Sequence, residues 1–122
     1  MPDVKGKQLA QVRPANTTAV SAYTPPSADI VTEIRLITVC NTTGSAATFR
    51  LFHDDNGTTY DETTALYFDK SVAANDTFSI EYTEDDGIWM DDDTGNLAVR
   101  TGTNSALTFT IYGVEHNDDL RN

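Results

Sequence analysis

A period of two in the apolar residues is the feature that most limits the fold of this chain. In residues 78–82, Phe, Ile and Tyr fall on one side of an extended chain, whereas Ser79 and Glu81 fall on the other. Residues 107–111 repeat the pattern as Leu-Thr-Phe-Thr-Ile. Such strands have one face in a core and one in water, as in antiparallel sheets. Because no segment of typical helix length has an amphipathic helical period, the sequence predicts an all-β protein.

Short runs rich in Thr, Val, Ile, Phe and Tyr predict about eight strands, separated by turns that contain Gly, Asn, Asp or Pro. The expected strands are 19–23, 30–41, 47–53, 65–69, 76–83, 87–90, 96–101 and 106–115. Strands of this number and spacing are typical of a single antiparallel β-sandwich with a jelly-roll-like arrangement. We expect the sandwich domain to span residues 17–116.

The two ends of the chain differ from this domain. Residues 1–16 are interrupted by Pro and Gly and have little apolar periodicity, so we expect an extended, flexible arm and not a core strand. The arm is basic, with Lys5, Lys7 and Arg13, and would be attracted to an acidic surface of its own or a neighbouring subunit. The alternative is a frayed terminus. Residues 117–122 predict a short, polar, solvated tail.

Composition excludes several classes of partner. The chain has 122 residues, enough for one domain that buries about two thirds of its unfolded surface. Its net charge of −11 repels phosphate backbones and anionic headgroups, so we expect neither nucleic acid nor membrane as a partner. The N-terminus does not resemble a signal peptide, so we expect folding in the cytoplasm. The single Cys40 lies in an apolar run and is predicted to be a buried thiol.

Two acidic runs supply the hard oxygen ligands that Ca²⁺ prefers. The candidate ligands are Asp54, Asp55, Asp91 and Asp93. The first run begins like an EF-hand loop, but Thr59 stands where that loop requires glycine and Ala65 where it requires glutamate. We therefore interpret these carboxylates as solvated turn residues, and we expect no bound metal and no cofactor.

Catalytic residues are sparse. The histidines are His53 and His116, and neither lies in a local signature that would place a nucleophile beside it. Cys40 and His53 are of the residue types found in catalytic Cys–His pairs, but nothing else in the sequence connects them. We predict that the protein is not an enzyme.

Aromatic residues in acidic segments leave a second function open. Trp89 lies between two acidic runs, and Tyr60 lies in a third acidic segment. Many β-sandwich lectins bind sugars by stacking a ring on the sugar while carboxylates accept its hydroxyl hydrogen bonds. A carbohydrate-binding module, assisted by calcium or not, is therefore an alternative. We favour the interpretation that Trp89 and Met90 fill one end of the sandwich or a subunit interface.

Four stretches resemble small β-sandwich virion proteins of tailed bacteriophages. They are residues 41–52, 64–68, 95–102 and 106–115. The order of features is also similar, with an N-terminal arm, a strand that ends in an Asn41-Thr42 turn, and a last strand that closes with Tyr-Gly-Val-Glu. The likeness covers roughly residues 8–116.

This resemblance implies a head decoration or cement protein, or a related neck or tail component, without catalytic residues. Such a protein binds major capsid protein subunits on the outer surface of the head, stabilises the head, and is assembled in the host cytoplasm. The resemblance also implies a homotrimer. The arm residues that would bind a capsid subunit or a neighbouring copy are Lys5, Lys7, Leu9, Val12 and Arg13.

Overall fold

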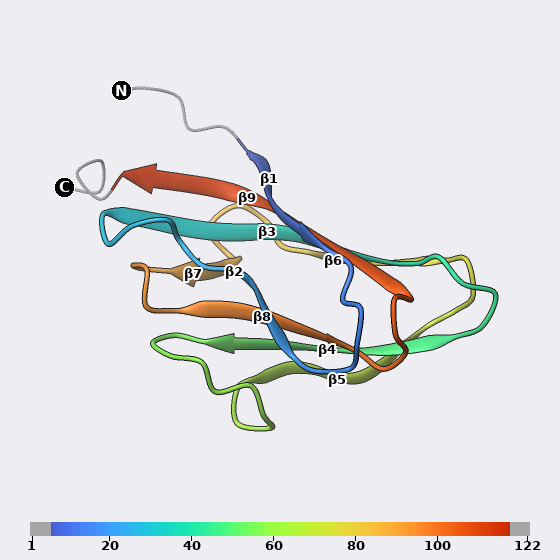
Figure 1. Cartoon of the computed structure of the whole chain (residues 1–122). Helices are drawn as coiled ribbons and strands as arrows, with labels where there is room; N and C mark the ends of the chain where they lie inside the picture. The colour runs from blue at the N-terminus through green and yellow to red at the C-terminus, as the bar shows by residue number, and fades with distance from the viewer. Residues whose placement is uncertain (1–5, 118–122) are drawn as a thin grey trace.

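A computed structural model describes residues 6–117, and nine strands run through this part of the chain. The strands are β1 (Lys7–Val12), β2 (Val20–Tyr23), β3 (Ile30–Asn41), β4 (Ala47–Asp54), β5 (Ala65–Val72), β6 (Thr77–Glu81), β7 (Ile88–Met90), β8 (Asn96–Thr101) and β9 (Leu107–Asn117). They form two antiparallel sheets packed as a sandwich (Figure 1). The predicted all-β sandwich is confirmed. Within residues 6–117 there is no helix long and apolar enough to span a membrane.

The strand order shows how the chain passes between the sheets. The first sheet has the order β1-β9-β3-β6, and β7 pairs with β3 beside β6. The second sheet has the order β2-β8-β4-β5. The longest pairing joins β3 to β9, from Ile30 opposite Asn117 to Asn41 opposite Leu107. Strands distant in sequence are therefore neighbours in each sheet, as in jelly-roll-like sandwiches.

Alternate side chains from both sheets fill the space between them. Ile34, Ile37 and Val39 of β3 are fully buried. The ring of Phe49 lies 5.9 Å from that of Phe109 in an edge-to-face arrangement, which joins β4 of one sheet to β9 of the other. Aromatic pairs of this geometry add to the stability that comes from burying their surface.

Residues 7–12 correct the expectation of an arm outside the sheets, because they form the edge strand β1. This strand pairs antiparallel with β9, and Leu9 and Val12 pack against the core. A register shift between Gln8 and Ala10 breaks the simple alternation, which is why the sequence lacks a strand pattern here. Lys5 lies outside the described residues, as does the expected tail beyond Asn117, which itself ends β9.

Candidate functional site

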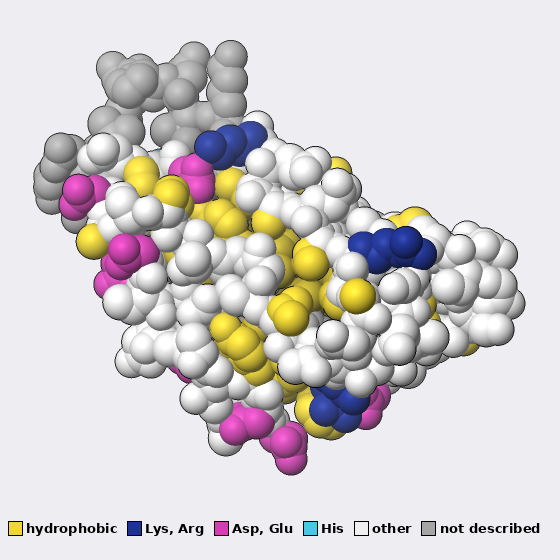
Figure 2. Space-filling view, in the orientation of Figure 1, with side chains coloured by type: hydrophobic (Ala, Val, Ile, Leu, Met, Phe, Trp, Pro, Cys, Tyr) yellow, Lys and Arg dark blue, Asp and Glu magenta, His cyan; other side chains and the backbone are white. Residues whose placement is uncertain are grey.

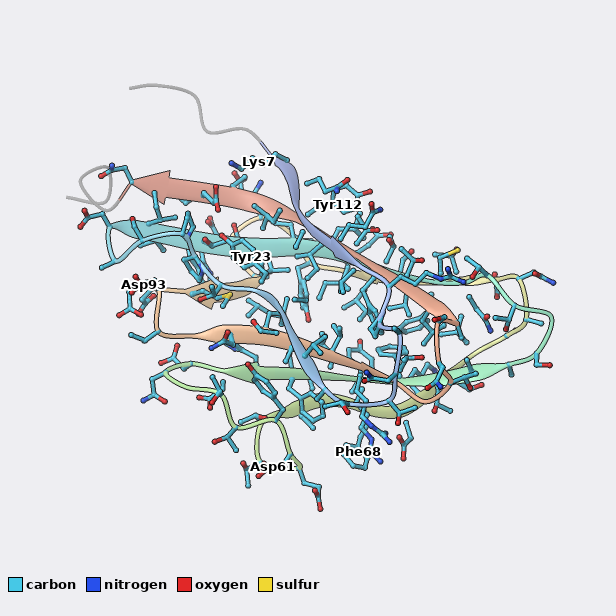
Figure 3. The ribbon with its side chains drawn as sticks, in the orientation of Figure 1. Lys7, Tyr23, Asp61, Phe68, Asp93 and Tyr112 are labelled. Carbon is cyan, nitrogen blue, oxygen red and sulfur yellow. The ribbon has the colours of Figure 1, made fainter. Side chains whose placement is uncertain are left out.

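A polar network holds the basic segment against the body of the sandwich. The Lys7 ammonium of β1 lies 2.7 Å from the carboxylate of Glu115 in β9. The Tyr23 hydroxyl of β2 donates to the other oxygen of that carboxylate and shares a 2.8 Å hydrogen bond with Thr32 of β3. Lys7 and Tyr23 are labelled on their strands in Figure 3. The network therefore links β1 to both sheets.

Burial and hydrogen bonding act in opposite directions on Glu115. Burial by itself raises the pKa of the Glu115 carboxyl, but hydrogen bonds from Lys7 and Tyr23 outweigh it, so the pKa lies below its usual value. Burial, and next the hydrogen bond to Glu115, raise the pKa of the Tyr23 phenol. At neutral pH the network thus consists of a carboxylate, an ammonium group and a neutral phenol.

The structure places the remaining arm residues as follows. Leu9 and Val12 face the core and anchor β1. Arg13 is exposed, and its Nη2 donates to Thr42 Oγ1 at 3.4 Å. The cationic groups of Lys7 and Arg13 are therefore more open to a partner than the two apolar side chains, which are partly buried against the core.

Trp89 lies on the outer face of the first sheet and does not fill the end of the sandwich. It is opposite Glu33 of β3, and its ring stacks on His116 with 6.2 Å between centroids. Its Nε1 donates to the Asp85 carbonyl at 3.3 Å, and the residue is 37% exposed. The next residue, Met90, belongs to the core and is 1% exposed, so it is not available to a surface ligand.

Glu33, which the sequence analysis did not single out, is a fully buried carboxylate beside Trp89. One oxygen lies 2.9 Å from Arg35 Nε, and the other accepts the Gly87 N–H at 3.1 Å. A buried carboxylate needs such partners to offset its loss of hydration. In the sequence, the position of Glu33 inside an apolar run was the feature that could have indicated its burial.

Tyr60 does not join Trp89 in a common site. Its half-buried ring packs against Phe52 of β4, with 6.2 Å between centroids, so it is placed by the second sheet. Trp89 is placed by β3 of the first sheet. No ring contact links the two within the described residues, and the arrangement expected for sugar stacking is not assembled from this pair.

The candidate catalytic residues are also separated. Cys40 lies in β3 of the first sheet and His53 in β4 of the second. Cys40 is half-buried, which corrects the prediction of a buried thiol: alternation along β3 directs Val39 into the core and Cys40 to the outer face. Burial lowers the pKa of His53, although Asp54 and Asp55 act in the opposite direction.

Among the candidate metal ligands, Asp54 is engaged in a turn, whereas Asp55, Asp91 and Asp93 are exposed and it is Asp92, between the last two, that holds the second turn. The Asp54 carboxylate accepts the backbone N–H groups of Asn56 and Thr59 at 3.1 and 2.9 Å, and these bonds lower its pKa. The Asp92 carboxylate accepts the hydroxyl and N–H of Thr94, which lowers its pKa in the same way. Residues 6–117 contain no group of three or more His, Cys, Asp or Glu side chains placed to hold a metal ion.

Loops 24–29, 54–64 and 91–95 meet at one end of the sandwich, which we call the acidic end. Thr24 Oγ1 donates to the Asp93 carbonyl at 3.4 Å and so joins two of these loops, and Asn96 Nδ2 at the start of β8 donates to the Gly57 carbonyl of the third at 2.8 Å. The acidic side chains are Asp29, Asp54, Asp55, Asp61, Glu62, Asp91, Asp92 and Asp93. These three loops contain no Lys or Arg. Figure 2 shows acidic side chains at the left and lower margins, toward this end.

The outer face of the second sheet holds a cluster that the sequence analysis missed. The Arg50 guanidinium carbon lies 3.7 Å from the centroid of the Phe68 ring, and Arg50 also makes hydrogen bonds of 2.7 and 3.1 Å to Asp69. These bonds lower the pKa of Asp69. Phe68 and Leu66 are 45% and 46% exposed. In the sequence, the spacing of two between Leu66 and Phe68 within the expected strand 65–69 already indicated that the two side chains share one face.

Neither a protein-family model nor a curated protein matches the sequence. Among solved structures, a chain in the structure of infectious bursal disease virus, Gx strain, superposes on 96% of this chain with a TM-score of 0.52 and 11% identity. The two share a fold. It is the all-β sandwich described above. The match covers 32% of the virus chain, so this protein spans about a third of that chain's length. A chain of the nora virus structure aligns over 93% of this chain and 54% of its own length, with 9% identity and a TM-score of 0.40.

Proposed function

We propose that this protein is a non-enzymatic structural protein of a virion, and more narrowly a decoration protein that binds the major capsid protein on the outside of a tailed-phage head. The shared fold with a virus protein over 96% of the chain carries the proposal. The resemblance of residues 8–116 to small phage virion proteins supports its narrower form. A net charge of −11 suits a subunit that must stay soluble before it docks.

The β1 edge is the docking element that the geometry favours. One edge of β1 pairs with β9, and within the described residues its other edge has no strand beside it. An extended segment of a capsid subunit can add to such an edge through backbone hydrogen bonds. Lys7 and Arg13, with Lys5 before them, would then meet acidic side chains of the capsid subunit, while Leu9 and Val12 anchor β1 to the core.

Quantitative mass spectrometry of purified particles of the virus that encodes this chain tests the proposal. We expect the protein in the head fraction, in many copies and at a constant ratio to the major capsid protein. Recovery only with separated tails would replace the decoration role by a tail role. Absence from purified particles would contradict the proposal altogether.

The role of the basic segment has its own test. We expect Lys5→Glu with Arg13→Glu to reduce occupancy on particles about tenfold or more, since each reversal replaces a cation of the basic N-terminal sequence by an acid. This variant retains the Lys7–Glu115 pair. The matched control adds the same acids at the exposed β6 positions Thr77 and Ser79. If the reversed variant and the control occupy particles equally, the basic segment has no role in docking, but the proposed virion role is unaffected.

A further inference from the structure

Strand β5 directs Leu66 and Phe68 outward on either side of the core-facing Tyr67, and its pairing with β4 is irregular at both places. A register shift between Phe49 and Leu51 places two residues of β5, Phe68 and Asp69, opposite the single residue Arg50. Asp69 has a φ of 56°, which is unusual for a residue other than glycine. Bulges re-aim side chains and are treated as specific features of a fold, not defects.

A second irregularity acts on Leu66. Leu51 is opposite Tyr67 and Phe52 is opposite Ala65, so Leu66 has no residue opposite it on β4. Leu66 and Phe68 are two of the three large hydrophobic residues that are exposed within the described residues. Leu66 and Phe68 together form an apolar projection at the margin of the second sheet.

The same features make β5 a poor edge for strand addition. The positive φ of Asp69 and the charged Lys70 interrupt the regular row of backbone donors and acceptors. Natural edge strands use bulges and charges to prevent edge-to-edge pairing. A partner at this place would thus contact side chains of the face and not the backbone of the edge.

The charge around the projection is positive. Arg100 of β8 is directly opposite Arg50 of β4, and Asp69 lies near both, at 2.7 Å from Arg50 and 4.0 Å from Arg100. Glu62 of the acidic end also interacts with Arg50, and Lys70 follows Asp69 in β5, so three cations stand against two anions here, in contrast to the net charge of −11 for the chain. We call the surface formed by Arg50, Leu66, Phe68 and Arg100 the Arg–Phe face. Arginine and aromatic residues are enriched where protein interfaces are buried.

The acidic end of the same chain has the complementary charge. It carries eight carboxylates and no Lys or Arg in its three loops. It also offers apolar contact surface, from the exposed Pro26 and the half-buried Tyr60. In Figure 3, Asp93 lies far from Phe68, at the opposite side of the molecule, whereas Asp61 lies nearer to Phe68, so the acidic end begins beside the Arg–Phe face and extends away from it.

We propose that the Arg–Phe face is a docking site for the acidic end of a second copy of this chain, so that copies associate head to tail. This contact joins two different surfaces, and repetition of it either closes a ring or extends a chain of subunits. A ring of three copies is the form that agrees with the expected homotrimer. The contact is independent of the β1 edge and of any capsid partner.

Native mass spectrometry of the purified full-length chain tests the proposal. We expect oligomers of the wild type, and a shift to monomer with at least tenfold weaker association for Leu66→Ser with Phe68→Ser. Both positions are about half exposed, so the variant should remain folded although it loses the contact of Phe68 with Arg50. Trp89→Ser, which changes the third exposed hydrophobic residue on the other sheet, is the matched control and should remain oligomeric. A monomeric wild type, or oligomers that persist in the double variant, would overturn the proposal.

A charge exchange tests the head-to-tail geometry. The face-reversed variant carries Arg50→Glu and Arg100→Glu, and the end-reversed variant carries Asp55→Lys and Asp93→Lys. Each alone should be monomeric, but their mixture should form heterodimers, because the acidic face of the first variant meets the basic end of the second; a ring of three would retain one repulsive contact and should not close. If two folded variants fail to associate when mixed, the head-to-tail contact is wrong. Because no particle is involved, these results are separable from the test of the virion role.

Discussion

At the scale of single residues, Glu115 stands out because it joins three strands. Its carboxylate accepts from Lys7 of β1 and Tyr23 of β2 while it belongs to β9. Its pKa is lowered in the folded protein, so the network stabilises the fold most where the carboxylate is ionised. The same network explains how a basic N-terminal segment is tied down in a molecule with few other cations.

We expect Glu115→Gln to lower the free energy of unfolding at neutral pH by about 1 kcal/mol, since an amide cannot pair with the Lys7 charge and Lys7 is largely exposed. The stabilisation by Glu115 is present above the usual glutamate pKa of 4.5 and is lost as the pH falls through the lower folded-state value. Urea unfolding from neutral to strongly acidic pH should show the two proteins converging below pH 4.5. A difference independent of pH would contradict this assignment.

Gly113 determines how closely β3 and β9 approach. A Cβ at this position would lie 2.1 Å from the Glu33 carbonyl oxygen, so Gly113→Ala must separate the two strands. We expect a loss of about 3 kcal/mol or more in the free energy of unfolding. Gly44→Ala is the control, because a Cβ there meets nothing within 4 Å. Equal stability of the two variants in chemical unfolding would show that the strands can separate freely.

At the scale of elements, β1 and β5 both depart from regular alternation. In β1 the register shift lets Leu9 and Val12 face the core although they are three residues apart. In β5 two shifts interrupt the register with β4, and Leu66 and Phe68 face outward on either side of Tyr67. One irregular strand thus seals an edge of the sandwich, and the other produces a surface for contact.

The packing of β1 can be tested, because a strand packed on the core contributes to the free energy of unfolding and a detached arm does not. We expect Leu9→Ala with Val12→Ala to lower the free energy of unfolding by about 2 kcal/mol, because two partly buried side chains lose their contacts with the core. Gln8→Ala, at an exposed position of the same strand, should change it by less than about 0.5 kcal/mol. Urea unfolding of the three proteins measures both effects. An unaffected double variant would mean that the segment behaves as a detached arm in solution.

At the scale of the whole molecule, charge is distributed unevenly along the sandwich. The loops of the acidic end hold eight carboxylates, whereas loops 42–46, 73–76 and 102–105 at the other end contain Asp76 as their one charged residue. The acidic end therefore repels itself at low ionic strength, and a cationic partner surface would relieve that repulsion.

We expect Asp55→Asn with Asp93→Asn to raise the melting temperature by about 1–3 °C at low salt, since two like charges leave a crowded end. The gain should fade as sodium chloride screens the remaining charges. Glu81→Gln, at an exposed position of β6 outside the acidic end, should give a smaller gain. Thermal unfolding at low and high salt makes the comparison. A gain that persists unchanged at high salt would exclude electrostatic repulsion as its cause.

Much of the fold was predictable because its signals are local. The expected strands 30–41 and 96–101 coincide with β3 and β8, and the strand ranges expected for the rest of the sandwich overlap β2, β4, β5, β6, β7 and β9. Alternation and turn residues act over a few neighbouring positions, so they can be read without knowledge of the partner strands. The strand β1 was not predicted, because its register shift disrupts the alternation of apolar residues on which the prediction depends.

The sequence by itself determined the all-β class, the positions of eight strands and the excess of negative charge, since these depend on residue types and short-range spacing. Only the tertiary structure decided that Lys7 meets Glu115, that Arg50 meets both Phe68 and Asp69, and that three acidic loops share one end. These groupings depend on strand order and register, which bring together residues up to about a hundred positions apart. The physical reason is that pairing and packing between distant strands are set by the whole sandwich, and no short stretch of sequence contains that information.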